Sequence, residues 1–408
     1  MGSSSPPDLP PASSPSLVLT QPTLAECRET WALTHPKWGP ALSLDEYLSR
    51  EEYLTTVPPG LTNWILTTAD GGAEGAARPV LSSCETMRKR AVACAAGGGE
   101  VCEGVAHGIA SVFTDPAKRG QGYARRMMSE LGPRLAGWQV SAAETRDGDD
   151  SATGPDRALF SVLYSDIGKA FYAKVGWPPF ESTHLTFPVP AAAPPAALDP
   201  PPAAADGPEP GVSPITTADL PALCAADEAR VRARVRDRAR STGKTCAALL
   251  PDAAALGWHL LREDFMTRRL FGRTPAVRGA VYGGAPGRRV WAVWARAYYG
   301  GAGTSEGNTL HILRFVLEDE EACGAEEGYV AAAFRGVVGA AMAEARAWCA
   351  ADVQVWNPGP VLRRAAEASG LGFGVVQREM ESIASLMWYG EGDVSDVEWV
   401  ANEKFGWC

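Results

Sequence analysis

Residues 111–128 constrain the fold more than any other part of this chain. A β-branched, apolar run is followed by a basic, glycine-containing turn at 118–124 and then by a segment with helical spacing of apolar residues. A strand, a turn and a helix in this order present free backbone N–H groups at a helix N-terminus, which favours phosphate. The small residues Gly120, Gly122 and Ala124 would let phosphate oxygens reach the backbone. The sequence therefore predicts a phosphate-binding turn.

The spacing excludes two common phosphate loops, because it has neither the Lys-Ser/Thr pair of a Walker A loop nor the three spaced glycines of a dinucleotide-binding turn. It resembles the acyl-CoA pyrophosphate loop of the GCN5-related N-acetyltransferases, Q/R-x-x-G-x-G/A, at Arg119, Gly122 and Ala124. An ordinary strand-to-helix turn is the alternative. The resemblance implies that coenzyme A contacts Val112, Phe113, Thr114, Arg119, Gly120, Gln121, Gly122, Tyr123 and Ala124.

A second segment supports this resemblance. Residues 158–165 predict a buried strand and 166–175 a helix, which Gly176 and Trp177 end. In this superfamily the same unit follows the coenzyme A loop, and a tyrosine four residues before the glycine acts as general acid. The resemblance implies this role for Tyr172; a core aromatic is the alternative. Ser165, which stands where the family often has Asn, is expected to contact coenzyme A.

Bulk properties narrow the class of protein. A chain of 408 residues suggests two domains. The net charge of −10 argues against a nucleic-acid-binding protein, and no apolar run approaches the ~20 residues of a membrane span. Nine scattered cysteines, five histidines without metal-ligand spacing and an N-terminus unlike a secretory signal predict a cytoplasmic protein without a metal site.

Proline-rich segments divide the chain. Residues 1–15 predict a disordered tail, and 188–214, which contain ten of the 32 prolines, predict an extended linker. The first domain, 16–187, has the order of strands and helices expected of an acetyltransferase: an α/β fold with a mixed sheet and helices on both faces.

The second domain, 215–408, shows a related order of strands and helices. However, its loop at 317–324 is acidic and would repel pyrophosphate, and Ala368 stands where the tyrosine would be expected. We therefore expect a degenerate second acetyltransferase-like α/β domain that forms part of the substrate pocket, while the first domain alone binds acetyl-CoA.

Several phrases together resemble one fungal family, the lysine N6-acetyltransferases of lysine degradation: residues 82–89, 111–114, 119–124, 163–172, 378–390 and 402–408. The resemblance implies direct transfer of acetyl from acetyl-CoA to the side-chain amine of L-lysine in a ternary complex. The alternatives are another amine, such as a protein lysine, a protein N-terminus or a polyamine, and a non-catalytic acyl-CoA sensor. A monomer and a homodimer both remain open.

The acceptor ammonium must lose a proton before it can attack. Acetyltransferases often direct an acid at the acetyl carbon from the strand that holds Glu85, so Glu85 is the candidate base, with a surface carboxylate as the alternative. The carboxylate of free lysine needs a cation and its amines need acceptors. Candidate partners are Arg378, Glu379 and Glu381, with surface ion pairs as the alternative.

Overall fold

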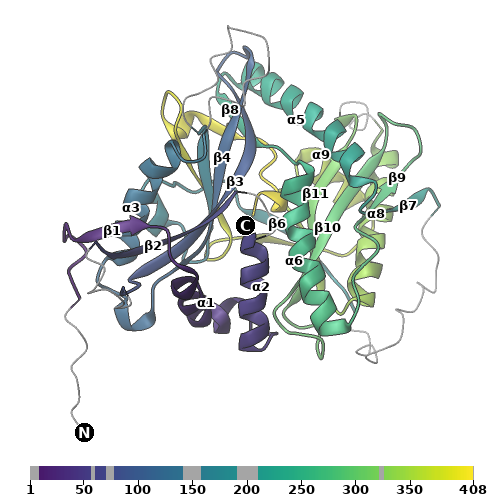
Figure 1. Cartoon of the computed structure of the whole chain (residues 1–408). Coiled ribbons are helices and arrows are strands. Elements are labelled where there is room, and N and C mark those ends of the chain that lie inside the picture. The colour runs from purple at the N-terminus through teal and green to yellow at the C-terminus, as the bar shows by residue number, and fades with distance from the viewer. Residues whose placement is uncertain are drawn as a thin grey trace.

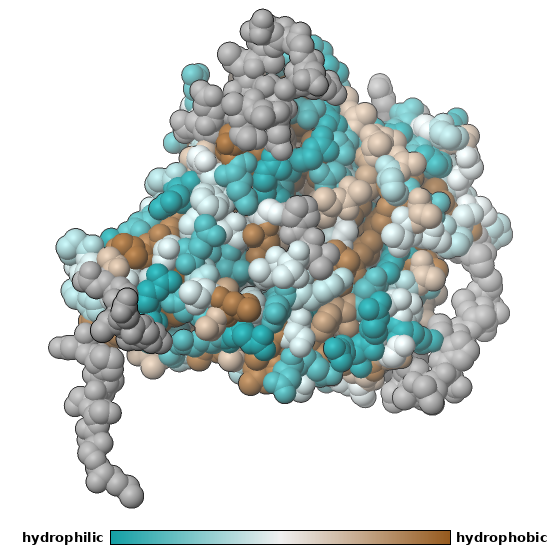
Figure 2. All heavy atoms as spheres, in the orientation of Figure 1, coloured by the Kyte–Doolittle hydropathy of each residue, from teal (hydrophilic) through white to brown (hydrophobic). Residues whose placement is uncertain are grey.

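The computed structural model describes residues 9–56, 60–69, 78–140, 158–190, 210–320 and 326–407. These residues form two mixed β-sheets that lie side by side, with α2 and α6 between them at the front of Figure 1. On the face shown in Figure 2, hydrophilic and hydrophobic residues are interspersed. No described helix is long and apolar enough to cross a membrane.

The first sheet is built mainly from the N-terminal half. Its central β4 pairs antiparallel with β3 and parallel with β5. The path of neighbours runs β1 (Leu17–Thr20), β2 (Leu61–Thr68), β3 (Ser82–Cys94), β4 (Val101–Phe113), β5 (Phe160–Ser165) and β14 (Ile383–Trp388); β8 (Thr245–Leu249) pairs with β3, and β15 (Val397–Trp399) with β8.

The second sheet has the same mixture of pairings, with β11 parallel to β12 and antiparallel to β10. Its order is β13 (Gly374–Gln377), β6 (Thr183–Pro188), β12 (Asp352–Trp356), β11 (Asn308–Leu317), β10 (Val290–Tyr298), β9 (Gly279–Tyr282) and β7 (Val212–Ile215). The expected α/β fold with mixed sheets is confirmed in both halves.

The helices follow local signals in the sequence. Thr23 and Glu26 form a capping box at the start of α1, and α3 buries a stripe that includes Met127, Met128 and Leu131. The helices are α1 (Leu24–Trp38), α2 (Leu44–Thr56), α3 (Tyr123–Ala136), α4 (Ala170–Ala173), α5 (Leu220–Thr242), α6 (Ala253–Phe271), α8 (Glu327–Ala347) and α9 (Pro360–Ala368).

The sheets do not divide where the domains were expected to divide. Strand β6, which precedes the expected linker 188–214, lies in the second sheet between β12 and β13. Strand β14, from the other end of the chain, pairs with β5 in the first sheet and satisfies the backbone groups of its open edge. The two halves therefore interlock, and one apolar core joins Phe160 and Leu386 to Trp291 and Leu313.

The expected tail and linker are partly described. Residues 9–15 are ordered rather than disordered, because polar groups of α3 bind their carbonyls: the Tyr123 hydroxyl donates to the Pro10 oxygen at 2.8 Å and Arg126 to the Ala12 oxygen at 2.8 Å. At the linker, β6 extends to Pro188 and β7 begins at Val212. Residues 1–8 and 191–209 lie outside the described residues.

Each sheet contains two neighbouring parallel strands whose pairing stops before the strands end. We call the region beyond the last paired residues the wedge of that sheet. Strand β4 pairs with β5 from Ala106 to Ile109, and then continues to Phe113 beside the turn that leads to α3. Strand β11 pairs with β12 from Thr309 to Ile312 and continues to Leu317. Since backbone groups beyond the paired residues need other partners, each wedge is a place where a further chain or ligand can bind.

Candidate active site

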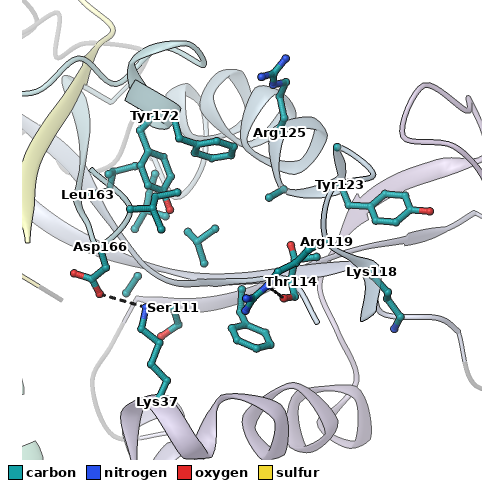
Figure 3. Close-up of a pocket in the computed structure, with 18 of the residues that line it drawn as sticks. Lys37, Ser111, Thr114, Lys118, Arg119, Tyr123, Arg125, Leu163, Asp166 and Tyr172 are labelled. Carbon is teal, nitrogen blue, oxygen red and sulfur yellow. Dashed lines mark hydrogen bonds and ion pairs between the residues drawn. The ribbon is translucent and has the colours of Figure 1, made fainter. Parts of the chain in front are cut away.

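The first wedge opens into a cavity of about 870 Å³ between β4, β5 and the N-terminus of α3 (Figure 3). All nine residues predicted from the loop and its strand line it, because they are contiguous along one strand-turn-helix unit. They are Val112, Phe113, Thr114, Arg119, Gly120, Gln121, Gly122, Tyr123 and Ala124.

The loop leaves the first turn of α3 open to a ligand. Gly120 and Gly122 have φ of 77° and 88°, a left-handed conformation that favours glycine. Gly122 is the N-cap of α3, and no side chain of the described residues makes a capping hydrogen bond there. The N–H groups of the first turn and the positive end of the helix therefore face the cavity mouth, as anion binding requires.

Basic side chains surround this helix end. Arg119 lies over the Phe113 ring, and its Nε donates to the Thr114 oxygen at 3.0 Å. The Lys118 amine donates to the Val80 oxygen at 2.7 Å. Arg125 is exposed and also lines the cavity (Figure 3). The sequence prediction missed Arg125, although its place just after the small residues of the loop is a usable signal.

Two of the residues predicted to contact coenzyme A have hydroxyl groups that do not face the cavity. The Tyr123 hydroxyl points away from the cavity (Figure 3), because it binds the Pro10 and Gln121 oxygens. The structure places Ser165 outside the cavity; its buried hydroxyl donates to the Gly168 oxygen at 2.7 Å and accepts from the Ile167 N–H. This hydroxyl shapes the turn after β5 instead of facing a ligand.

Tyr172 lines the same cavity from the side of β5 and is 7% exposed. Burial raises the pKa of its phenol well above the usual value, so the hydroxyl stays protonated at neutral pH. The helix that carries it, α4, is shorter than predicted. Asp166 does not cap this helix but accepts from the Ser382 N–H at 3.1 Å and lies 3.8 Å from the Lys37 amine.

Glu85 lies beside this cavity at a bulge in the pairing of β3 with β4. The Ser111 hydroxyl donates to the Glu85 carboxylate, and Ser111 also lines the cavity. Ser111 has φ of 53°, an unusual conformation for a residue other than glycine, as often found at functional sites. Burial, with the nearby Glu51 charge, raises the pKa of Glu85 to about 7, against the opposing effect of the Ser111 hydrogen bond.

A second cavity of about 850 Å³ adjoins the first, and the two share Lys37, Trp38 and Asp166. Its walls come from α6, the second sheet, residues 376–382 and the C-terminal segment. Figure 3 shows Lys37 reaching from α1 across to Asp166, at the boundary of the two cavities.

The predicted substrate residues take different places around this second cavity. Arg378 is 7% exposed and stacks 3.9 Å from the Trp356 ring centre. Glu379 and Glu381 are exposed at the rim, and Glu379 pairs with Lys169 at 2.7 Å, which matches the alternative of a surface ion pair.

Three histidines from separate strands and helices also line the second cavity. Burial lowers the pKa of His184 to about 4 and those of His259 and His311 well below their usual value, so all three are neutral near pH 7. Among the described residues no group of histidine, cysteine or acidic side chains is arranged to hold a metal ion. Sequence spacing gives no sign of this cluster, because residues 184, 259 and 311 meet only in the fold.

Comparison with known proteins identifies the family. The family model described as the LYC1 GNAT-like C-terminal domain matches residues 197–408, more than half of the chain. The chain belongs to this family. The match confirms the resemblance to fungal lysine acetyltransferases drawn from the sequence. It covers the C-terminal segment and the strands β10, β11 and β12, which line the second cavity of this GNAT_LYC1-like protein.

Individual relatives are more distant. A protein named lysine acetyltransferase from Yarrowia lipolytica is 33% identical over 161 residues, which cover 37% of this chain and 38% of that relative. A probable N-acyltransferase from Enterococcus faecalis aligns over 91% of this chain and 71% of its own, with a TM-score of 0.47 and 13% identity. A GCN5-related N-acetyltransferase from Anabaena variabilis aligns over 91% and 72%, with a TM-score of 0.45 and 13% identity.

Proposed function

We propose that this protein transfers acetyl from acetyl-CoA to the side-chain amine of L-lysine by direct attack in a ternary complex. The observation that carries the proposal is the junction of the two cavities at Lys37, Trp38 and Asp166. The first cavity has a free helix N-terminus and basic side chains suited to an acyl-CoA pyrophosphate. The second has room for a small acceptor.

In this proposal the first wedge holds coenzyme A. Pyrophosphate binds the N–H groups at the start of α3, with charge supplied by Arg119 and Arg125. Pantetheine lies along β4, where the backbone of Val112 to Thr114 runs beyond its pairing with β5. This arrangement places the thioester near Ser111 and Tyr172, which line the same cavity.

The acceptor amine must lose a proton, which costs roughly 4–5 kcal/mol at pH 7 for a free lysine side chain of pKa ~10.4. Glu85 takes this proton, directly or through Ser111, because a carboxyl with a pKa of about 7 is matched to neutral pH. The amine attacks the thioester carbonyl, the carbon–sulfur bond breaks, and Tyr172 protonates the departing thiolate.

L-Lysine is the favoured acceptor because the family match and the printed name of the Yarrowia relative both indicate a lysine acetyltransferase. On the same resemblance, the proposal includes a cytoplasmic location and a role in lysine degradation. A peptide lysine is less suited, because the second cavity is walled by the second sheet and the C-terminal segment.

The test is an assay of purified protein with acetyl-CoA and L-lysine, in which mass spectrometry follows acetyl-lysine and a thiol reagent follows coenzyme A release. N6-acetyl-lysine formed well above background supports the proposal. Acetyl-CoA binding, seen as a rise in melting temperature, without product from lysine or from a panel of amines and peptides would instead support an acyl-CoA sensor.

A further inference from the structure

The first cavity is lined by several cations and one acid. Among the described residues that line it, Asp166 is the only acidic one, whereas Lys37, Lys118, Arg119 and Arg125 are basic. This balance suits a negatively charged acyl-CoA, but it repels an acceptor whose amine arrives as an ammonium ion. An acceptor of that charge therefore needs a carboxylate close to the point where it enters the cavity.

Asp166 lies at this point of entry, because it lines both cavities. The other acids of the second cavity within the described part of the chain, Glu379 and Glu381, are exposed at its rim. In Figure 3, Asp166 lies toward the same end of the first cavity as Ser111 and Tyr172, and the basic loop lies toward the other end. The acid is thus separated from the proposed pyrophosphate site and lies near the proposed site of transfer.

One oxygen of the Asp166 carboxylate is fixed and the other is available. Oδ1 accepts from the Ser382 N–H at 3.1 Å, which holds the carboxylate in place. Oδ2 lies 3.8 Å from the Lys37 amine, which is too far for a hydrogen bond, and no other donor of the described residues binds it. The side chains of Lys37 and Asp166 are 52% and 40% exposed, so this ion pair is weak. An ammonium ion with better geometry can therefore replace Lys37 at Oδ2.

Lys37 is itself a lysine ammonium at the boundary of the two cavities. It lies in the last turn of α1, where the negative end of the helix favours a cation. Its amine lies 5.3 Å from the centre of the Trp38 ring, and Trp38 also lines both cavities. A carboxylate and the face of an indole ring both attract an ammonium ion. Asp166 and Trp38 therefore form an ammonium site that Lys37 occupies in the free protein.

We infer that Asp166 and Trp38 are the entry site for the ammonium ion of the acceptor, which displaces Lys37 from it. The inference rests on the proposed acetyl transfer and assigns the residues that recognise the cationic end of the acceptor. The acceptor binds here with its proton, moves toward Ser111 and then gives the proton to Glu85. Because the Asp166 charge stabilises the protonated amine, it favours binding of the acceptor and not the chemical step.

Two substitutions that break the same ion pair should have opposite effects. Asp166→Asn removes the charge but keeps an oxygen for the Ser382 N–H, and should raise KM for L-lysine by about three- to tenfold. Lys37→Gln removes the competing cation and should lower this KM by about two- to fourfold. Both variants should keep kcat within about twofold of the wild-type value. An ion pair with a purely structural role would make both variants change KM in the same direction.

Two further variants test the displacement of Lys37. Lys37→Arg keeps the charge and should leave KM for L-lysine close to the wild-type value. In the double variant Asp166→Asn/Lys37→Gln, the second substitution should no longer lower KM, because its effect comes from freeing the carboxylate. The controls are Lys174→Gln and Asp396→Asn, exposed residues that line neither cavity and should change neither constant. Steady-state rates of the full-length protein, with L-lysine varied at saturating acetyl-CoA, measure all of these effects.

The outcomes separate this inference from the proposed function. If L-lysine is acetylated but Asp166→Asn leaves its KM unchanged, or both single variants change KM in one direction, the ammonium site is wrong while acetyl transfer stands. If Lys37→Gln leaves KM unchanged, or lowers it equally with and without Asp166, the displacement of Lys37 is wrong. If acetyl-CoA binds to the wild-type protein and L-lysine is not acetylated, the proposed function fails and the ammonium site fails with it.

Discussion

The Ser111 hydroxyl donates a hydrogen bond to the Glu85 carboxylate at the bulge in the antiparallel pairing of β3 with β4. Ser111 lines the first cavity and also a small neighbouring space, which Glu85 and Glu51 line as well. The hydroxyl is therefore the group through which a proton at the first cavity can reach a carboxyl whose pKa is raised to about 7.

The first prediction concerns the activity of Glu85→Gln. Removing the base should lower kcat by about 10²- to 10⁴-fold, the usual contribution of general base catalysis. The wild-type kcat/KM for lysine should rise as pH increases through about 7, since the carboxyl must be ionised to accept a proton. Stopped assays between pH 5.5 and 9 measure both effects, with Glu52→Gln on the exposed face of α2 as the control. If Glu85→Gln shows the same rate and the same pH dependence of kcat/KM as the wild type, Glu85 is not the base.

The Glu85 carboxyl should make the folded protein less stable as pH rises, which is the opposite of the usual effect of a paired carboxylate. The pKa of Glu85 is about 7 in the folded protein, higher than its usual value of 4.5. The carboxyl therefore stabilises the fold fully below pH 4.5, and this contribution is lost as pH rises through about 7. Urea unfolding of wild type and Glu85→Gln at pH 5 and pH 8 should show the variant losing less free energy of unfolding over this interval. Equal losses in both proteins would contradict the raised pKa.

Tyr172→Phe should lower kcat by about 10- to 10⁴-fold with little change in the melting temperature. Burial keeps the phenol protonated, and loss of the hydroxyl removes the acid while the ring still packs. Steady-state rates at saturating acetyl-CoA measure the effect, and Tyr53→Phe, a tyrosine on α2 that packs against Phe265, is the control. An unaltered kcat would show that Tyr172 is a packed core aromatic residue and not the general acid.

The lining of the first cavity could be predicted from the sequence because its residues are close together in the chain. One strand-turn-helix unit brings Val112, Arg119 and Gly122 together whatever the rest of the chain does. Ser165 shows the limit of this reasoning: the superfamily pattern gives its position in the chain, but the turn after β5 directs its hydroxyl to the Gly168 oxygen.

The second cavity could not be predicted in the same way. Its walls include Arg378, Lys404 and Trp356, which are far apart in the sequence. They come together because β14 pairs with β5 in the first sheet and the C-terminal segment binds β11 of the second sheet. Neither pairing has a signal in hydrophobic periodicity, which marks a buried face but does not name the partner strand. The exchange of β6 and β14 between the sheets was therefore missed.

Arg125→Gln should raise KM for acetyl-CoA by about three- to tenfold and leave kcat unchanged. Arg125 is exposed at the helix end proposed to bind the pyrophosphate, so we expect its contribution to be a partly screened charge contact. The difference from wild type should shrink between 50 mM and 500 mM salt. Arg364→Gln on α9, which is also exposed, is the matched control. A kcat effect without a KM effect would remove Arg125 from the coenzyme A site.

The C-terminal segment should be required for both stability and acceptor binding. Deleting 402–408 removes Glu403 from the second wedge and exposes the core around Phe405, so we expect loss of transfer and a lower melting temperature. Phe405→Ala should reduce the free energy of unfolding by about 3–5 kcal/mol, the usual cost of emptying a buried aromatic site. Phe405→Leu, which refills much of that volume, should recover part of the loss. Urea titration and lysine kinetics measure these effects, and unchanged values in the deletion variant would show that the tail is dispensable.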